Sequence, residues 1–115
     1  MLDVQIVSIV REYLRDIDRR GIPVRFGVLY GSWATGRVHE GSDIDLVVVS
    51  PHFDGGIRRP DINLLWKTAA LVDSRIEPVA CGERQWVEDD ASAIIEIARR
   101  EGERISLEEA VGPRI

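Results

Sequence analysis

Residues 28–50 read VLYGSWATGRVHEGSDIDLVVVS, and this stretch decides the fold. Its second half, from Asp43 to Val49, is rich in β-branched and aliphatic residues, which predicts a buried strand. Two aspartates stand inside that strand, although aspartate is disfavoured in strands and two like charges repel each other. A glycine–serine pair, Gly31-Ser32, comes before them in the chain. The two features need a common explanation.

The spacing of the aspartates gives the first part of that explanation. Side chains at positions i and i+2 of a strand point to the same face, so Asp43 and Asp45 share one face, with their Cα atoms roughly 7 Å apart. A divalent cation between the two carboxylates turns their repulsion into binding. Mg²⁺ prefers oxygen ligands and leaves positions open for substrate phosphates. The pair therefore predicts a metal site. The other face takes the alternate aliphatic residues, Ile44, Leu46 and Val48.

The pair Gly31-Ser32 predicts a phosphate site beside the metal site. A strand that is followed by a glycine turn and the start of a helix presents backbone N–H groups to an anion. Glycine allows close approach of the backbone, and the Ser32 hydroxyl adds a donor. Taken alone, a Gly-Ser pair is more often an ordinary turn. An Asp-x-Asp pair alone also occurs at solvated strand edges, in calcium loops and in some sugar-nucleotide transferases. Together, in this order, the two motifs indicate a combined phosphate and metal site far more specifically than either motif does alone.

The stretch GSWATGRVHEGSDIDLVVVS resembles the signature of the DNA polymerase beta-type nucleotidyltransferase superfamily. The short chain is similar to the minimal branch of that superfamily, the MNT proteins. The resemblance implies an α/β (α+β) fold with a small mixed sheet flanked by helices. It also implies that Asp43 and Asp45 hold two Mg²⁺ ions, while Gly31 and Ser32 grip the β- and γ-phosphates of a nucleoside triphosphate. The implied reaction is transfer of a nucleoside monophosphate, AMP from ATP, to an acceptor hydroxyl.

The resemblance also implies a third carboxylate from a later strand. Glu77, in SRIEPVACG, is the candidate, because it lies inside a short predicted strand. Asp73 competes with it, but stands at the junction of a helix and that strand. Glu77 would complete the second metal site and act as a general base. Many relatives carry aspartate there, and the alternative for Glu77 is an exposed residue at a strand edge.

The partners follow from the resemblance alone. It implies an antitoxin-like protein whose partner is a small helical toxin of the HEPN type, to which AMP is transferred. A second copy of the chain is the other acceptor considered. A rival hypothesis is a binding protein that neutralises its partner by contact, with little or no catalysis. Transfer to a small molecule such as an aminoglycoside is a third hypothesis, disfavoured because no acceptor domain is visible in the sequence.

Length, composition and charge limit the number of domains and the kinds of partner that the chain can have. The chain has 115 residues, 44% hydrophobic and 30% charged, which predicts one domain over residues 1–115 with an ordinary core. Its net charge of −5 gives no general attraction to nucleic acid or anionic membranes. The single cysteine, Cys81, excludes an internal disulfide and predicts a cytoplasmic protein. The N-terminal residues are interrupted by polar and charged side chains, and predict neither a signal peptide nor a membrane span.

Periodicity predicts alternating helices and strands. Apolar residues three and four apart favour helices, and short β-branched runs favour strands. A turn with one short helix is expected at 31–36, and a loop at 50–60. The tail from 102 to 115 is poorly determined, with Ser106 as a candidate helix cap. The predicted helices span residues 2–20, 61–72 and 91–100, and the predicted strands span residues 24–30, 43–49 and 75–80.

Overall fold

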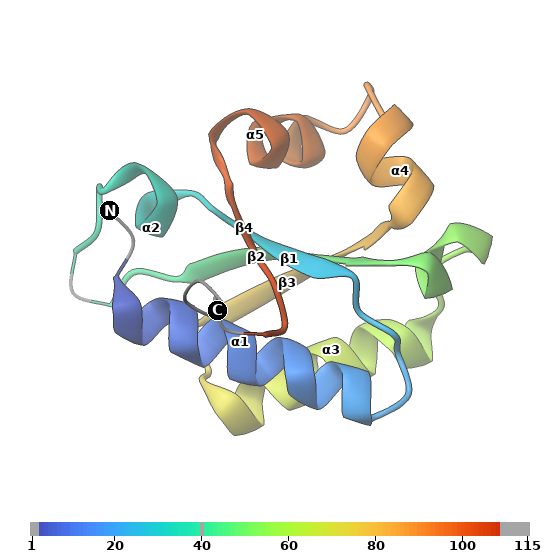
Figure 1. The fold of residues 1–115 in the computed structure, drawn as a ribbon, viewed down its shortest axis with the longest axis horizontal. Helices are drawn as coiled ribbons and strands as arrows, with labels where there is room; N and C mark the ends of the chain where they lie inside the picture. The colour runs from blue at the N-terminus through green and yellow to red at the C-terminus, as the bar shows by residue number, and fades with distance from the viewer. Residues whose placement is uncertain (1–2, 40, 109–115) are drawn as a thin grey trace, which may run out of the picture.

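The computed structural model describes residues 3–39 and 41–108. Its centre is a four-stranded mixed sheet with the strand order β3-β2-β1-β4 (Figure 1). Strand β1 runs antiparallel to β2 and β4, while β2 and β3 are parallel. The predicted mixed α/β fold is therefore confirmed. The strands are β1 (Phe26–Tyr30), β2 (Ile44–Ser50), β3 (Ile76–Gly82) and β4 (Glu103–Ile105).

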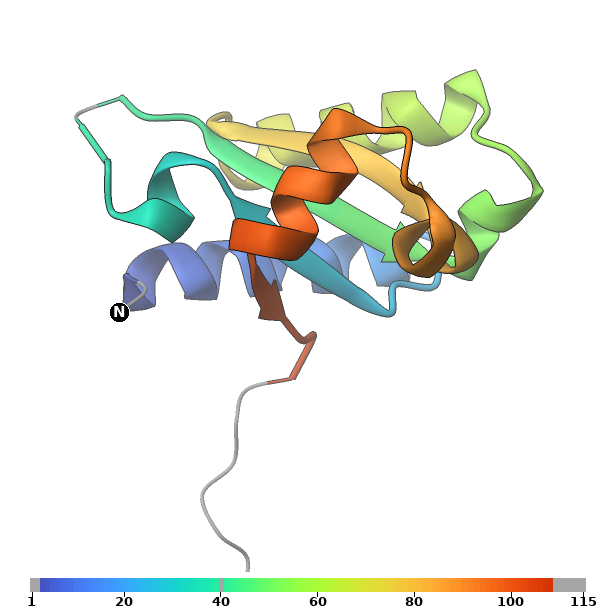
Figure 2. The ribbon, with the colours of Figure 1, turned by 90° about the horizontal axis from the view of Figure 1, so that it is seen from above.

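Helices cover both faces of this sheet. The helices α1 (Val4–Arg19) and α3 (Arg59–Val72) lie on one face, and α4 (Glu83–Glu88) and α5 (Ala93–Glu101) lie on the other (Figure 1). Seen from above, α5 crosses the sheet in front of β1 and β2 (Figure 2). The helices are α1 (Val4–Arg19), α2 (Ser32–Thr35), α3 (Arg59–Val72), α4 (Glu83–Glu88) and α5 (Ala93–Glu101), with a 3-10 helix η1 (Pro51–Gly55).

Strand β2 divides its side chains between two cores, as its alternation predicts. Ile44, Leu46 and Val48 belong to the core under α1 and α3. Val47 and Val49 belong to the smaller core under α5. All five are fully buried, and burying each aliphatic side chain contributes about 1.5–3 kcal/mol. This double burial fixes the register of β2, because a slip of one residue would exchange the two faces.

Helix α1 supplies the larger core with one apolar stripe. Its N-cap is Asp3, whose carboxylate accepts the amides of Gln5 and Ile6 at 2.8 and 3.2 Å. The Tyr13 hydroxyl donates to the carbonyl of Leu65 at 2.8 Å, which joins α1 to α3. The buried residues of the stripe are Ile6, Val10, Tyr13, Leu14 and Ile17.

Several boundaries differ from the predictions. Part of the predicted loop at 50–60 is η1, and α3 begins at Arg59, because Pro60 suits the first turn of a helix. Helix α4 and strand β4 were not predicted. Helix α4 has six residues and none is buried, whereas β4 has three residues and only Ile105 is buried.

The predicted helix start at Ser106 is wrong within the described residues, since residues 106–108 form no helix. Instead, the Ser106 carbonyl accepts the Nε–H of Arg11 at 3.1 Å, which holds this segment against α1. The remainder of that predicted helix, from residue 109 onwards, lies outside the described residues. Across the two described ranges, no helix has both the length and the apolar character needed to cross a membrane.

Candidate active site

Three neighbouring strands bring Tyr30, Asp45 and Glu77 into one row. In the sheet register, Asp45 of β2 stands opposite Tyr30 of β1 on one side and Glu77 of β3 on the other. Residues in register point to the same face, here the face that α5 covers. Asp43 lies one residue before β2 and is exposed, while Asp45 and Glu77 are half-buried. The three predicted carboxylates therefore lie at one end of the sheet.

The charges of this row act on one another. Burial, followed by the charge of Asp43, raises the pKa of Asp45. Burial also raises the pKa of Glu77, and the charges of Asp43 and Asp45 and a hydrogen bond with the Asp43 side chain raise it further. Each shift reports crowded negative charge in a partly desolvated place. A cation among these oxygens would relieve it.

Gly31 lies directly against Asp45. Its φ of +74° and ψ of −146° belong to a region that L-residues with a side chain rarely adopt. A Cβ at this position would lie 2.4 Å from Oδ2 of Asp45. The amides of Ala34 and Thr35 both donate to the Gly31 carbonyl at 3.1 Å, so α2 starts at once. The amides of Ser32 and Trp33 precede that first intrahelical bond and are the donors an anion would meet.

The sequence model of the nucleotidyltransferase domain family matches residues 7–109, which include every element of this row. The chain belongs to this family. The resemblance seen in the sequence is thereby confirmed. The comparison with curated protein sequences gives no match.

Solved structures share the nucleotidyltransferase fold of this chain. The structure of a toxin–antitoxin with AMP-PNP has 23% identity and a TM-score of 0.57, over 82% of this chain and 70% of that one. A mutant of the toxin–antitoxin MntA–HpeT has 21% identity and a TM-score of 0.55, over 82% and 70%. A protein from Sulfolobus solfataricus, assigned as a nucleotidyltransferase, has 16% identity and a TM-score of 0.54, over 71% of each chain.

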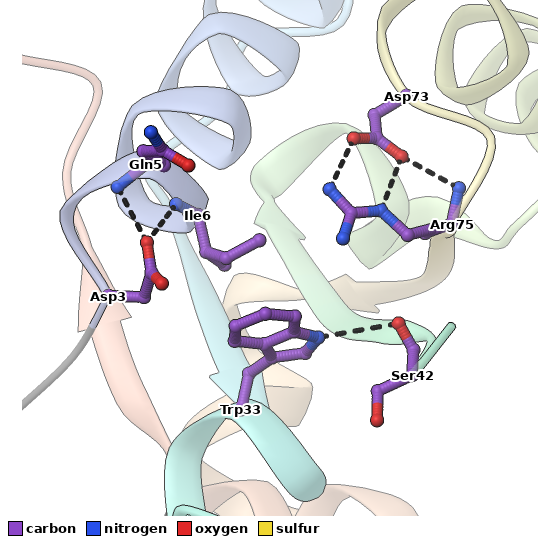
Figure 3. Close-up of polar contacts among 7 residues, drawn as sticks. All are labelled: Asp3, Gln5, Ile6, Trp33, Ser42, Asp73 and Arg75. Carbon is purple, nitrogen blue, oxygen red and sulfur yellow. Dashed lines mark hydrogen bonds and ion pairs between the residues drawn. The ribbon is translucent and has the colours of Figure 1, made fainter. Parts of the chain in front are cut away.

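Asp73, the competitor for the third carboxylate, is engaged elsewhere (Figure 3). Its two carboxylate oxygens accept Nε–H and Nη2–H of Arg75 at 3.1 and 2.8 Å, and Oδ1 also accepts the Arg75 amide at 2.9 Å. The side-chain hydrogen bond with Arg75 is the main reason why the pKa of Asp73 is lowered. Asp73 ends α3 and does not join the row, which leaves Glu77 as the carboxylate next to Asp45 in register.

Tyr30 is a member of the row that sequence reasoning missed. It is half-buried, and burial, then the charges of Asp45 and Glu77, raise its pKa to about 12. Its phenol therefore stays protonated and can donate a hydrogen bond toward the carboxylates or a substrate oxygen. The sequence did contain an indication for Tyr30. The residue ends the strand that leads into Gly31, and it stands two positions after the buried Val28, so the two side chains share one face of β1.

The donor chemistry of the row fits a divalent cation. Carboxylate oxygens are the ligands that Mg²⁺ prefers. Burial is the main reason why the pKa values of Asp45 and Glu77 are raised, and the charges of neighbouring carboxylates raise them further. Among residues 3–39 and 41–108, no three His, Cys, Asp or Glu side chains are gathered closely enough to hold an ion as they stand. The ligand set Asp43, Asp45 and Glu77 therefore stays a prediction.

Proposed function

We propose that this nucleotidyltransferase domain catalyses the Mg²⁺-dependent transfer of a nucleoside monophosphate, AMP from ATP, to an acceptor hydroxyl. The observation that carries the proposal is the row in which Asp45 stands in register with Glu77 and in contact range of Gly31. The charge of Asp43 raises the pKa of both Asp45 and Glu77, which indicates that the three carboxylates are near one another. A predicted phosphate turn and a predicted metal site thus adjoin in space as well as in sequence.

Each residue has a defined part in this proposal. Asp43, Asp45 and Glu77 hold the divalent cations, with Glu77 completing the second site. When bound, the cations neutralise the triphosphate and lower the pKa of the acceptor hydroxyl. The backbone amides at Gly31 and Ser32, with the Ser32 hydroxyl, bind the β- and γ-phosphates.

The proton of the acceptor passes to Glu77 as general base. The acceptor oxygen then forms a bond to the α-phosphorus as the bond to pyrophosphate breaks.

The similar solved structures support a toxin as the partner. One is a toxin–antitoxin with AMP-PNP, an analogue of ATP. In another, two aspartates that are two positions apart are replaced by glutamate, the same spacing as Asp43 and Asp45. We therefore propose an antitoxin-type enzyme, of one domain over residues 1–115, that acts in the cytoplasm on a helical HEPN-type partner. A second copy of the chain is the alternative acceptor.

The test uses ATP labelled at the α-phosphate, with a parallel run labelled at the γ-phosphate, Mg²⁺ and the protein encoded by the neighbouring gene. Label that is transferred only from the α position, and is lost in Asp43→Asn/Asp45→Asn, is the expected result. Asp90→Asn is the matched control, because Asp90 is an exposed carboxylate between α4 and α5. Transfer that survives in the double variant would overturn the proposed roles.

A second function is neutralisation of the partner by contact. The observation that favours it is that no set of three metal ligands is assembled among the described residues. The double variant separates the two functions, since contact neutralisation requires that it still binds the partner and still rescues growth. Loss of rescue together with loss of labelling, while binding persists, favours catalysis.

A further inference from the structure

Trp33 lies beside two other segments of the chain, those of Ser42 and of Arg75 (Figure 3). The residue is half-buried and packs against the core under α1 and α3, the face opposite the carboxylate row. Its indole Nε1–H points to the carbonyl of Ser42, at 3.4 Å. On another side, the guanidinium carbon of Arg75 lies 5.9 Å from the centre of the indole ring.

Each of these segments carries one part of the proposed site. Trp33 directly follows Ser32, Ser42 directly precedes Asp43, and Arg75 stands two residues before Glu77. The segments are therefore linked at the points where the phosphate turn and the carboxylates begin.

Further hydrogen bonds make the linked segments stiff. Ser42 is only 4% exposed, its hydroxyl accepts the His39 amide at 2.9 Å, and its own amide donates to the His39 carbonyl at 3.0 Å. The Arg75 carbonyl accepts the amide of Ile44 at 2.8 Å, which joins the start of β2 to the start of β3. The loop before Asp43 is thus closed on Ser42, and Ser42 is the point that Trp33 holds.

The cation beside the indole is itself held in place. Asp73 binds the Arg75 guanidinium through both carboxylate oxygens, which fixes the direction of that side chain. The carboxylate that competes for a metal role in the sequence thus serves to orient Arg75. Arg75 then faces the ring of Trp33 as a cation, an arrangement that aromatic rings favour.

We propose that Trp33 is a positioning residue, whose indole sets the distance between the phosphate turn at Ser32 and the loop that carries Asp43. The inference rests on the proposed function. Transfer requires the phosphates and the cation ligands to be held in one geometry, and a misplacement of about 1 Å can cost about 10²-fold in rate. Residues that support a site from behind are a normal source of such precision.

The test compares Trp33→Phe with Trp86→Phe. Both changes keep an aromatic ring and remove an indole N–H. Trp86 is also half-buried, but it packs edge-on against Phe26 in the smaller core. Urea unfolding shows that each variant is folded.

Trp33→Phe is expected to speed amide hydrogen exchange in residues 41–44, to lower kcat about tenfold or more, and to raise the Mg²⁺ concentration needed for half-maximal rate. The KM for ATP should change less. Trp86→Phe should leave all four quantities near the wild-type values. If Trp33→Phe and Trp86→Phe give the same values of these four quantities, the inference is overturned. It is also overturned if Trp33→Phe exchanges faster but transfers nucleotide at the wild-type rate.

A wild-type chain that transfers no nucleotide overturns the proposed function instead. Calorimetric titration with Mn²⁺ then decides the role of Trp33. Weaker binding in Trp33→Phe alone supports the positioning role, and equal binding in both variants overturns it. A wild-type chain that binds no Mn²⁺ overturns both proposals.

Discussion

Replacing Gly31 by alanine perturbs the backbone and the site at once. The residue has a φ of +74° and a ψ of −146°, where an L-residue with a side chain is strained. The added Cβ would lie 2.4 Å from Oδ2, 3.3 Å from Cγ and 3.5 Å from Cβ of Asp45. Ordinary contacts between heavy atoms lie at about 3.5–4.0 Å, so Oδ2 of Asp45 would have to move away by about 1 Å or more to make room for the added Cβ.

The two effects have different magnitudes and different readouts. The strained backbone is expected to lower the free energy of unfolding by about 1–3 kcal/mol. The carboxylate can move at modest cost in stability, because Oδ2 is the end of a side chain. Its displacement should lower the rate of transfer about 10²-fold, which corresponds to about 2.7 kcal/mol of activation free energy. Gly31→Ala should therefore be folded, somewhat less stable, and nearly inactive.

The assay measures urea unfolding and Mg²⁺-dependent transfer on the same preparations. Gly36→Ala is the matched control, because Gly36 ends α2 with a φ of +78° and nothing lies within 4 Å of the methyl carbon that the change would add. It should lose about 1–2 kcal/mol of stability and keep its transfer rate. The reasoning is refuted by Gly31→Ala that transfers at the rate of Gly36→Ala.

Three further outcomes are expected. Mg²⁺ at 100 times its Kd should raise the free energy of unfolding by about 2.7 kcal/mol, measured by urea titration, and should not do so in Asp43→Asn/Asp45→Asn. The raised pKa of Asp45 means that the folded state holds the proton more tightly, so without metal its contribution to stability falls as pH rises from about 4 through the raised pKa. Asp45→Asn should lack that fall and be more stable than the wild type at neutral pH. The Tyr30 phenol should titrate near pH 12 in ultraviolet absorbance, and Glu77→Gln should lower that value by removing one of its causes.

The alternation of apolar residues made β2 the most predictable part of the fold. Val47 and Val49 face one core while Leu46 and Val48 face the other, as a period of two requires. The same periodicity predicted the shared face of Asp43 and Asp45. Periodicity does not predict which strands pair with each other. Glu77 came from family resemblance, and its register with Asp45 is a long-range fact of the fold.

Tyr30 and Trp33 show why the remainder was missed. Both depend on neighbours that are distant in the chain: Asp45 for Tyr30, and Ser42 and Arg75 for Trp33. An aromatic residue on either side of Gly31-Ser32 is interpreted as a packing residue until those neighbours are known. Strand β4 was missed for a different reason, since three residues with two charges carry no period and pair with β1 only once α5 has turned the chain back.

The half-buried Asp45 costs the fold free energy, and the strand that carries it offsets that cost. Raised pKa values at Asp45 and Glu77 mean that each ionised carboxylate destabilises the folded chain at neutral pH. Leu46, Val47 and their fully buried neighbours contribute about 1.5–3 kcal/mol each, and they also prevent the slip that would move Asp45 to the other face. Packing therefore keeps these carboxylates close together, and a divalent cation bound among them would offset the part of the cost that comes from their mutual repulsion.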